Sequence, residues 1–116
     1  MLNWRLPVIV ALFLASALFH AFALQWPGIS VSESPETHLL FVFVNLWFAA
    51  ETEMLARRFF IGLGLLMLHQ FGVHGYLLIN AVLTHRPADF DFQSAGVLLG
   101  LTVVATLSIE AARSRE

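Results

Sequence analysis

The 116-residue sequence contains neither cysteine nor lysine. The lack of cysteine excludes disulfides, thiolate ligands to a metal or a haem, and thiol redox chemistry within this chain. The lack of lysine excludes a retinal-type Schiff base and any other mechanism that uses a lysine amine as nucleophile. Thiol-based and lysine-based mechanisms therefore need no further consideration.

Charged residues are also scarce, because they make up only 12% of the chain while hydrophobic residues make up 59%. A soluble domain usually has about a quarter of its residues charged. So few charges could not cover a water-exposed surface, and lipid must therefore be the solvent for much of the chain. The formal net charge of −2 leaves no basic face, so nucleic acid is not expected as a partner.

Long apolar segments are what the sequence has in place of charge. A helix needs about 20 mostly apolar residues to cross the roughly 30 Å hydrocarbon layer of a bilayer. Four segments reach or approach that length, at about residues 6–25, 37–56, 58–84 and 92–113. The sequence thus predicts an all-α integral membrane protein: a single membrane domain over residues 1–116, with four transmembrane helices in a compact bundle.

The arginines predict the orientation of these helices. Alternate loops of a membrane protein share a side, which puts five of the six arginines on one side and Arg86 alone on the other. By the positive-inside rule, the side with five arginines is cytoplasmic. We therefore expect both termini to be cytoplasmic (N-in/C-in), in a bacterial cytoplasmic (inner) membrane. The five arginines on that side are Arg5, Arg57, Arg58, Arg113 and Arg115.

The first segment also has features of a secretory signal peptide. A basic start, an apolar stretch and an A-x-A pattern at Ala21–Ala23 are typical of such a signal. The apolar run is long for the core of a signal, however, which favours a helix that is retained.

Two carboxylates lie near the end of the second segment. Glu53 and Arg57 are four residues apart, so on a helix they would lie side by side. This spacing indicates a hydrated helix end followed by a tight turn. The alternative is that Glu51 and Glu53 line an ion path, since carboxylates inside a membrane are usually functional.

Polar side chains interrupt three of the four segments near the middle of the bilayer. At a rise of about 1.5 Å per residue, five of them fall in one slab near the membrane centre. His38 falls outside that slab, near the outer rim. The five residues of the slab are His20, Asn45, His69, Gln70 and His74.

The third segment carries its polar residues on two faces. Gln70 and His74 share one face, whereas His69, Tyr76 and Asn80 lie on a second face about 100° away. A polar sector this wide implies that the helix has neighbours on more than one side. Together with Asn45, the residues Gln70, Tyr76 and Asn80 form a polar cluster within the membrane.

Two interpretations of the central histidines are favoured over the others. In the first, neutral imidazoles and amides only hydrogen-bond one another between helices, as is common in membrane proteins. In the second, His20 and His74, or His69, ligate a haem or a chlorophyll-type pigment, because imidazole is a good axial ligand. His69 and His74 cannot bind one metal from a straight helix, since residues five apart point about 140° apart.

Two further interpretations stay open. Histidines titrate near neutral pH and can carry protons, although no carboxylate falls at the membrane centre, where proton paths usually have one. A quinone pocket is the other interpretation, with histidine and amide donors reaching carbonyl oxygens in an apolar slot.

In size and helix count the chain resembles the small multidrug transporters and the fluoride channels. The transporters need a membrane-embedded glutamate in the first helix, and the segment at 6–25 has no acidic residue. No polar pattern matches the channels, so neither resemblance extends to function.

Almost all of the chain lies within the four segments, which leaves no room for a substrate-binding domain in water. We therefore expect a non-enzymatic accessory or scaffolding subunit of a larger, for example energy-transducing, membrane complex. Its partners would be the lipid bilayer and other membrane subunits or its own copies. A cofactor-binding membrane protein and a small homo-oligomeric transporter or channel are the alternatives.

Overall fold

The computed structural model describes residues 3–26, 34–84 and 92–116, and the regular structure in these ranges is helical. Four helices follow one another: α1 (Arg5–Gln25), α2 (Pro35–Glu51), α3 (Arg57–Leu83) and α4 (Phe92–Arg113). Helices α1, α3 and α4 are long and apolar enough to cross a membrane, and α2 is shorter, with 17 residues. The prediction of an all-helical chain with four helices is confirmed.

The start of α2 follows from its local sequence. The Ser34 hydroxyl oxygen accepts a hydrogen bond from the backbone N–H of Thr37 at 3.2 Å, which satisfies an N–H that has no partner within the helix. Pro35 occupies the first helical position, where its missing N–H costs nothing and its fixed φ suits the helix.

The end of α2 differs from the sequence-based expectation. The helix ends at Glu51 rather than at residue 56, and Leu55 in the following turn has a φ of 45°. Such a left-handed residue cannot continue a right-handed helix. Glu53 and Arg57 are therefore not on one helix, and the predicted side-by-side placement of this pair is wrong.

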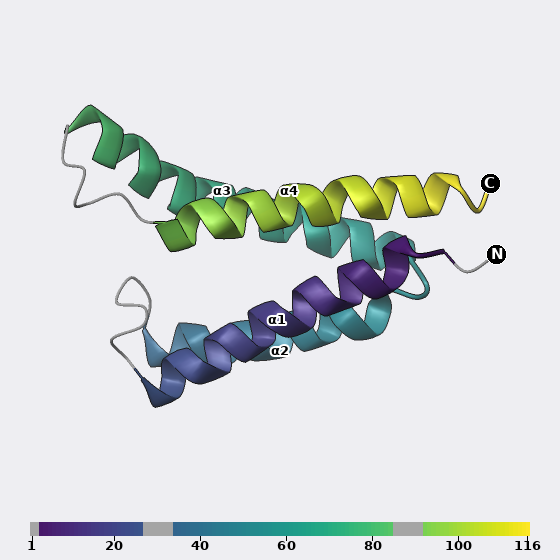
Figure 1. Cartoon of the computed structure of the whole chain (residues 1–116), viewed down its shortest axis with the longest axis horizontal. Helices are drawn as coiled ribbons and strands as arrows, with labels where there is room; N and C mark the ends of the chain where they lie inside the picture. Colours follow the sequence, from purple (N-terminus) through teal and green to yellow (C-terminus); the bar gives the residue numbers. More distant parts are fainter. Residues whose placement is uncertain (1–2, 27–33, 85–91) are drawn as a thin grey trace.

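The four helices form two hairpins. Helix α1 packs along α2, and α3 packs along α4, while α1 also contacts α4 (Figure 1). The hairpins meet at the end that holds both termini and the turn between α2 and α3, here called the closed end. They diverge toward the other end, here called the open end, where the last turns of α3 stand away from α1 and α2 (Figure 1).

An aromatic cluster joins the hairpins on the side of the closed end. Phe13 of α1 stacks on Phe48 of α2, with ring centroids 4.9 Å apart and planes 9° apart. Phe59 of α3 meets both rings edge-on, at 6.4 Å from Phe13 and 5.6 Å from Phe48. Since aromatic pairs in these arrangements add to the energy of area burial, this cluster holds three helices together.

Two ion pairs bind helices to one another at the closed end. Arg5 of α1 donates to Glu110 of α4 at 3.0 Å. Arg58 of α3 holds the carboxylate of Glu51 with two nitrogens, at 2.5 and 3.0 Å. The bidentate geometry fixes the angle between α2 and α3 as well as their distance.

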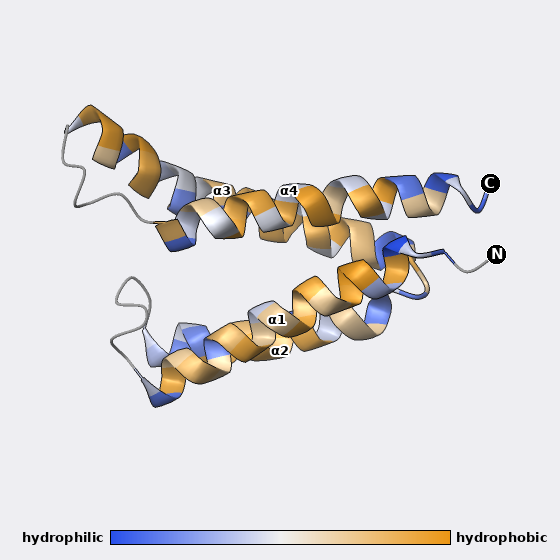
Figure 2. Cartoon of the chain, viewed as in Figure 1, coloured by the Kyte–Doolittle hydropathy of each residue, from blue (hydrophilic) through white to orange (hydrophobic). Residues whose placement is uncertain are grey.

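The C-terminal residues close the same end. Arg115 donates to the backbone carbonyls of Met54 and Glu53, at 3.1 and 2.6 Å. Asn3 donates to the Ser114 hydroxyl at 3.2 Å. The chain ends and the turn after α2 are thus joined by polar contacts, and the exposed sides of the helices are mainly apolar (Figure 2).

Candidate functional site

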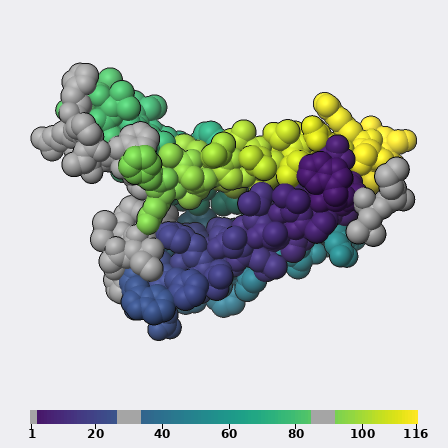
Figure 3. Space-filling view, in the orientation of Figure 1, coloured from purple at the N-terminus to yellow at the C-terminus, as the bar shows by residue number. Residues whose placement is uncertain are grey.

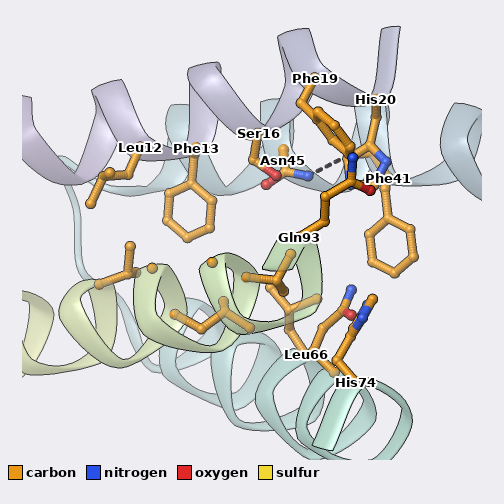
Figure 4. A pocket seen from close by; sticks show the side chains of 16 residues that line it. Leu12, Phe13, Ser16, Phe19, His20, Phe41, Asn45, Leu66, His74 and Gln93 are labelled. Atoms are coloured by element: carbon orange, nitrogen blue, oxygen red, sulfur yellow. Dashed lines mark hydrogen bonds between the residues drawn. The ribbon is translucent and has the colours of Figure 1, made fainter. Parts of the chain in front are cut away.

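A cavity of about 360 Å³ lies between the two hairpins, and residues of all four helices line it. Figure 3 shows the hollow between α1 and α4, and Figure 4 shows the lining side chains. The lining comprises Leu12, Phe13, Ser16, Phe19, His20, Phe41, Asn45, Leu66, Gln70, His74, Gln93, Gly96, Val97, Gly100, Leu101 and Val104. The cavity exists because the hairpins that meet at the closed end separate beyond the aromatic cluster.

Most of the lining is apolar, and two glycines open it on one side. Gly96 and Gly100 of α4 both line the cavity, and a Cβ atom added at either would meet nothing within 4 Å. On the α1–α2 hairpin, Phe13, Phe19 and Phe41 supply aromatic rings. The cavity is therefore a slot with aromatic walls opposite a helix face that lacks side chains at two positions.

The structure brings four of the sequence-predicted site residues to this one cavity. His20 comes from α1, Asn45 from α2, and Gln70 and His74 from α3. Their side chains are all at least nine-tenths buried. Four of the five polar residues of the slab thus line the space between the hairpins.

The other polar face of α3 does not contribute to the cavity. His69, Tyr76 and Asn80 are exposed and do not line the cavity. The His69 ring lies 6.1 Å from that of Phe41, which lines the slot, but His69 itself is not among the lining residues. Glu51 and Glu53 are also outside the cavity, at the closed end, where Glu51 is paired with Arg58.

A histidine pair joins α1 to α2. Nδ1 of His20 lies 2.8 Å from Nδ1 of His38, so one of the two nitrogens donates a proton and the other accepts it. Both side chains are buried, with 8% and 2% of their surfaces exposed. The pair connects the cavity, which His20 lines, with His38 behind it, and the sequence analysis missed His38 as a site residue.

A second polar pair joins α3 to α4 in the same way. Nδ1 of His74 lies 2.6 Å from the hydroxyl oxygen of Ser94, and Ser94 is fully buried. His20 lies five residues before the end of α1 and His38 three residues after the start of α2, so a similar distance from the helix ends would have pointed to His38. His74 lies nine residues before the end of α3 and Ser94 only two after the start of α4, so this signal would not have found Ser94. Each hairpin thus has a buried polar contact between its two helices.

The two amides of the cavity differ in their hydrogen bonding. Nδ2 of Asn45 donates to the backbone carbonyl of Phe41, one turn earlier, at 2.7 Å. Gln70 is only 5% exposed, and its Oε1 accepts no hydrogen bond from any residue that the structure describes. A buried polar atom without a partner is rare in folded proteins and calls for an explanation.

Among the described residues that line the cavity there is no aspartate, glutamate or arginine. Within residues 3–26, 34–84 and 92–116, no group of three or more histidine and carboxylate side chains is placed to hold a metal ion. The polar groups of the described lining are imidazoles, amides and a hydroxyl, which can form hydrogen bonds.

Comparisons with known protein families, with curated proteins and with solved structures found no match to this chain. The arguments for its function therefore come from its own residues.

Proposed function

We propose that this chain is a non-enzymatic integral membrane protein that holds a lipophilic small molecule between its two hairpins. Three helices have the length and composition of membrane spans, and large apolar side chains cover their outer faces. Helix α2, with 17 residues, is about 25 Å long at the usual rise per residue. Packed along α1, it is close to the roughly 30 Å hydrocarbon thickness, so all four helices would lie in the bilayer.

The observation that carries the binding role is the slot between the hairpins. Ligand sites in proteins are mostly apolar spaces of about 300–1,000 Å³ that contain a few polar groups. The cavity here has about 360 Å³ and combines aromatic and aliphatic walls with His20, Asn45, Gln70 and His74. Its opening between α1 and α4 (Figure 3) would face lipid, so a molecule dissolved in the bilayer could enter from the side.

Variants with larger side chains in the slot test the proposed binding function. We expect the protein purified in mild detergent to carry a lipophilic molecule that mass spectrometry of a solvent extract detects. The variant Gly96→Leu with Gly100→Leu should lose at least nine-tenths of it, because both positions line the slot and have open space for a larger side chain. Gly64→Leu is the matched control, since a Cβ there also meets nothing within 4 Å but lies outside the lining.

Equal amounts of bound molecule in the filled variant and in the control would overturn the proposal. An absorption spectrum of the same preparation would identify a haem or a chlorophyll-type pigment by its band. Such a band, lost in His20→Leu or His74→Leu, would make these histidines ligands of a tetrapyrrole.

A role as an accessory subunit of a larger membrane complex is the second candidate. The observation that favours it is the exposed face of α3 that carries His69, Tyr76 and Asn80. Polar side chains at membrane depth are more stable against another helix than against lipid. A photo-crosslinking residue at position 76 should capture another membrane subunit in native membranes. The same residue at position 82 should not, because Val82 is also exposed but lies about 120–160° around the helix from His69, Tyr76 and Asn80. Capture of lipid alone at both positions would overturn this role.

A further inference from the structure

We infer that the slot takes an uncharged, ring-bearing molecule whose polar head changes between carbonyl groups, which accept hydrogen bonds, and hydroxyl groups, which donate them, as the quinone and quinol class does. This inference rests on the ligand-binding function proposed above and names the class of ligand. Three features of the cavity carry it: the charge of its lining, the hydrogen bonding of Gln70 and the shape of its walls.

The described lining favours an uncharged head group. Among the described residues that line the slot, the polar side chains are two histidines, two glutamines, an asparagine and a serine, and none is an arginine, aspartate or glutamate. A fatty-acid carboxylate, a phospholipid phosphate or the propionates of a haem would place unpaired charge in a low-dielectric slot. Burial of an unpaired charge costs several kcal/mol per ion in a protein, so an uncharged head is favoured.

Gln70 provides the hydrogen bonding that such a head needs. Its Oε1 has no donor among the described residues although the side chain is almost fully buried. Rotation about the last side-chain torsion exchanges Oε1 with the Nε2 donor, so the amide can accept from a hydroxyl or donate to a carbonyl. A head that changes between carbonyl and hydroxyl would be bound in both forms by the same residue.

The walls of the slot suit a flat ring. The rings of Phe13 and Phe41 are directed from the α1–α2 hairpin toward the other hairpin (Figure 4). Phe41 is stacked on His20 with centroids 5.2 Å apart and planes 21° apart. Opposite them, Gly96 and Gly100 leave open space on α4. A planar ring between them would have aromatic contacts on one face and helix backbone on the other, with its tail leaving between α1 and α4.

The test uses decylubiquinone and its reduced quinol form as probes, titrated into the detergent-purified full-length chain by isothermal titration calorimetry. We expect both forms to bind, and palmitate to bind at least tenfold more weakly. Gln70→Leu should weaken the binding of both forms about tenfold, which is the loss of one neutral hydrogen bond. Gly96→Leu should abolish specific binding, so its remaining signal reports partitioning into detergent, and Gly64→Leu should leave binding unchanged.

The outcomes separate the ligand class from the binding function. Binding of palmitate as tight as that of decylubiquinone, or no effect of Gln70→Leu, would overturn the class. So would a protein that carries an extractable lipophilic molecule in its slot yet binds neither form of the probe. If no molecule is extracted and Gly96→Leu behaves like Gly64→Leu with every probe, the binding function itself is wrong.

Discussion

Buried polar side chains of this protein form pairs between the two helices of each hairpin. The bond between His20 and His38 joins α1 to α2, and the bond between His74 and Ser94 joins α3 to α4. A buried imidazole whose partner is removed has to give up a hydrogen bond that lipid cannot replace. The two pairs therefore fix the register of each hairpin near the open end, where the hairpins themselves have separated.

A double-mutant cycle measures the coupling free energy between His20 and His38. We expect His20→Leu and His38→Leu each to lower the free energy of unfolding, because each leaves the other imidazole without this bond. The double variant should lose less than the sum, by about 0.6 kcal/mol and at most about 1.7 kcal/mol, the range found for hydrogen bonds between membrane helices. Unfolding in mixed micelles, followed by circular dichroism, gives these values. Strictly additive losses would mean that the two rings contribute independently.

Depth along a helix was predictable from the sequence for four of the cavity residues, but the depth of His38, the partner of His20, was not. The centre of α1 (Arg5–Gln25) is residue 15, so His20 lies five residues past it. The centre of α2 (Pro35–Glu51) is residue 43, so His38 lies five residues before it, at the same depth in an antiparallel hairpin. The expected helix at 37–56 had its centre about three residues later and moved His38 to the rim.

At the scale of the elements, helix geometry predicted the two polar faces of α3 but not which of them is buried. The 100° rotation per residue separates Gln70 and His74 from the face of His69, Tyr76 and Asn80, and the structure buries the first face and exposes the second. Rotation alone cannot tell which face is covered, because that depends on where α4 packs. The early end of α2 was equally hidden, since nothing in the apolar residues after Glu53 indicates the left-handed Leu55.

Close approach of α2 and α3 depends on one glycine. A Cβ at Gly62 would come within 3.2 Å of the Trp47 ring and 3.3 Å of the Phe48 ring, whereas a Cβ at Gly64 would meet nothing within 4 Å. We expect Gly62→Leu to destabilise the protein by about 1–3 kcal/mol through overpacking. Gly64→Leu should be near neutral or slightly stabilising, because leucine is the better helix former. Thermal unfolding in detergent measures both, and equal melting temperatures would show that α3 shifts freely away from α2.

At the scale of the whole molecule, polar contacts and apolar contacts are separated along its length. The ion pair of Arg5 with Glu110 and the contacts of Arg115 with the α2–α3 turn gather at the closed end. The cavity and the buried histidines lie beyond it. Contacts between residues more than 60 positions apart, such as those of Arg115, could not be read from periodicity, whereas the gathering of arginines at one end was visible in their alternation between segments.

That gathering leads to a prediction of orientation, which the absence of cysteine makes simple to test. Single cysteines at Gln25 and Thr84 report the open end, and single cysteines at Glu53 and Glu116 report the closed end; all four residues are exposed. By the positive-inside rule we expect the closed end, with its arginines, to be cytoplasmic, so a membrane-impermeant maleimide should label only Gln25→Cys and Thr84→Cys in intact cells. Glu53→Cys and Glu116→Cys should react only after permeabilisation. Labelling of Glu53→Cys from outside would show that α2 does not cross the bilayer, and reversal of all four would place the open end of the cavity in the cytoplasmic half of the membrane.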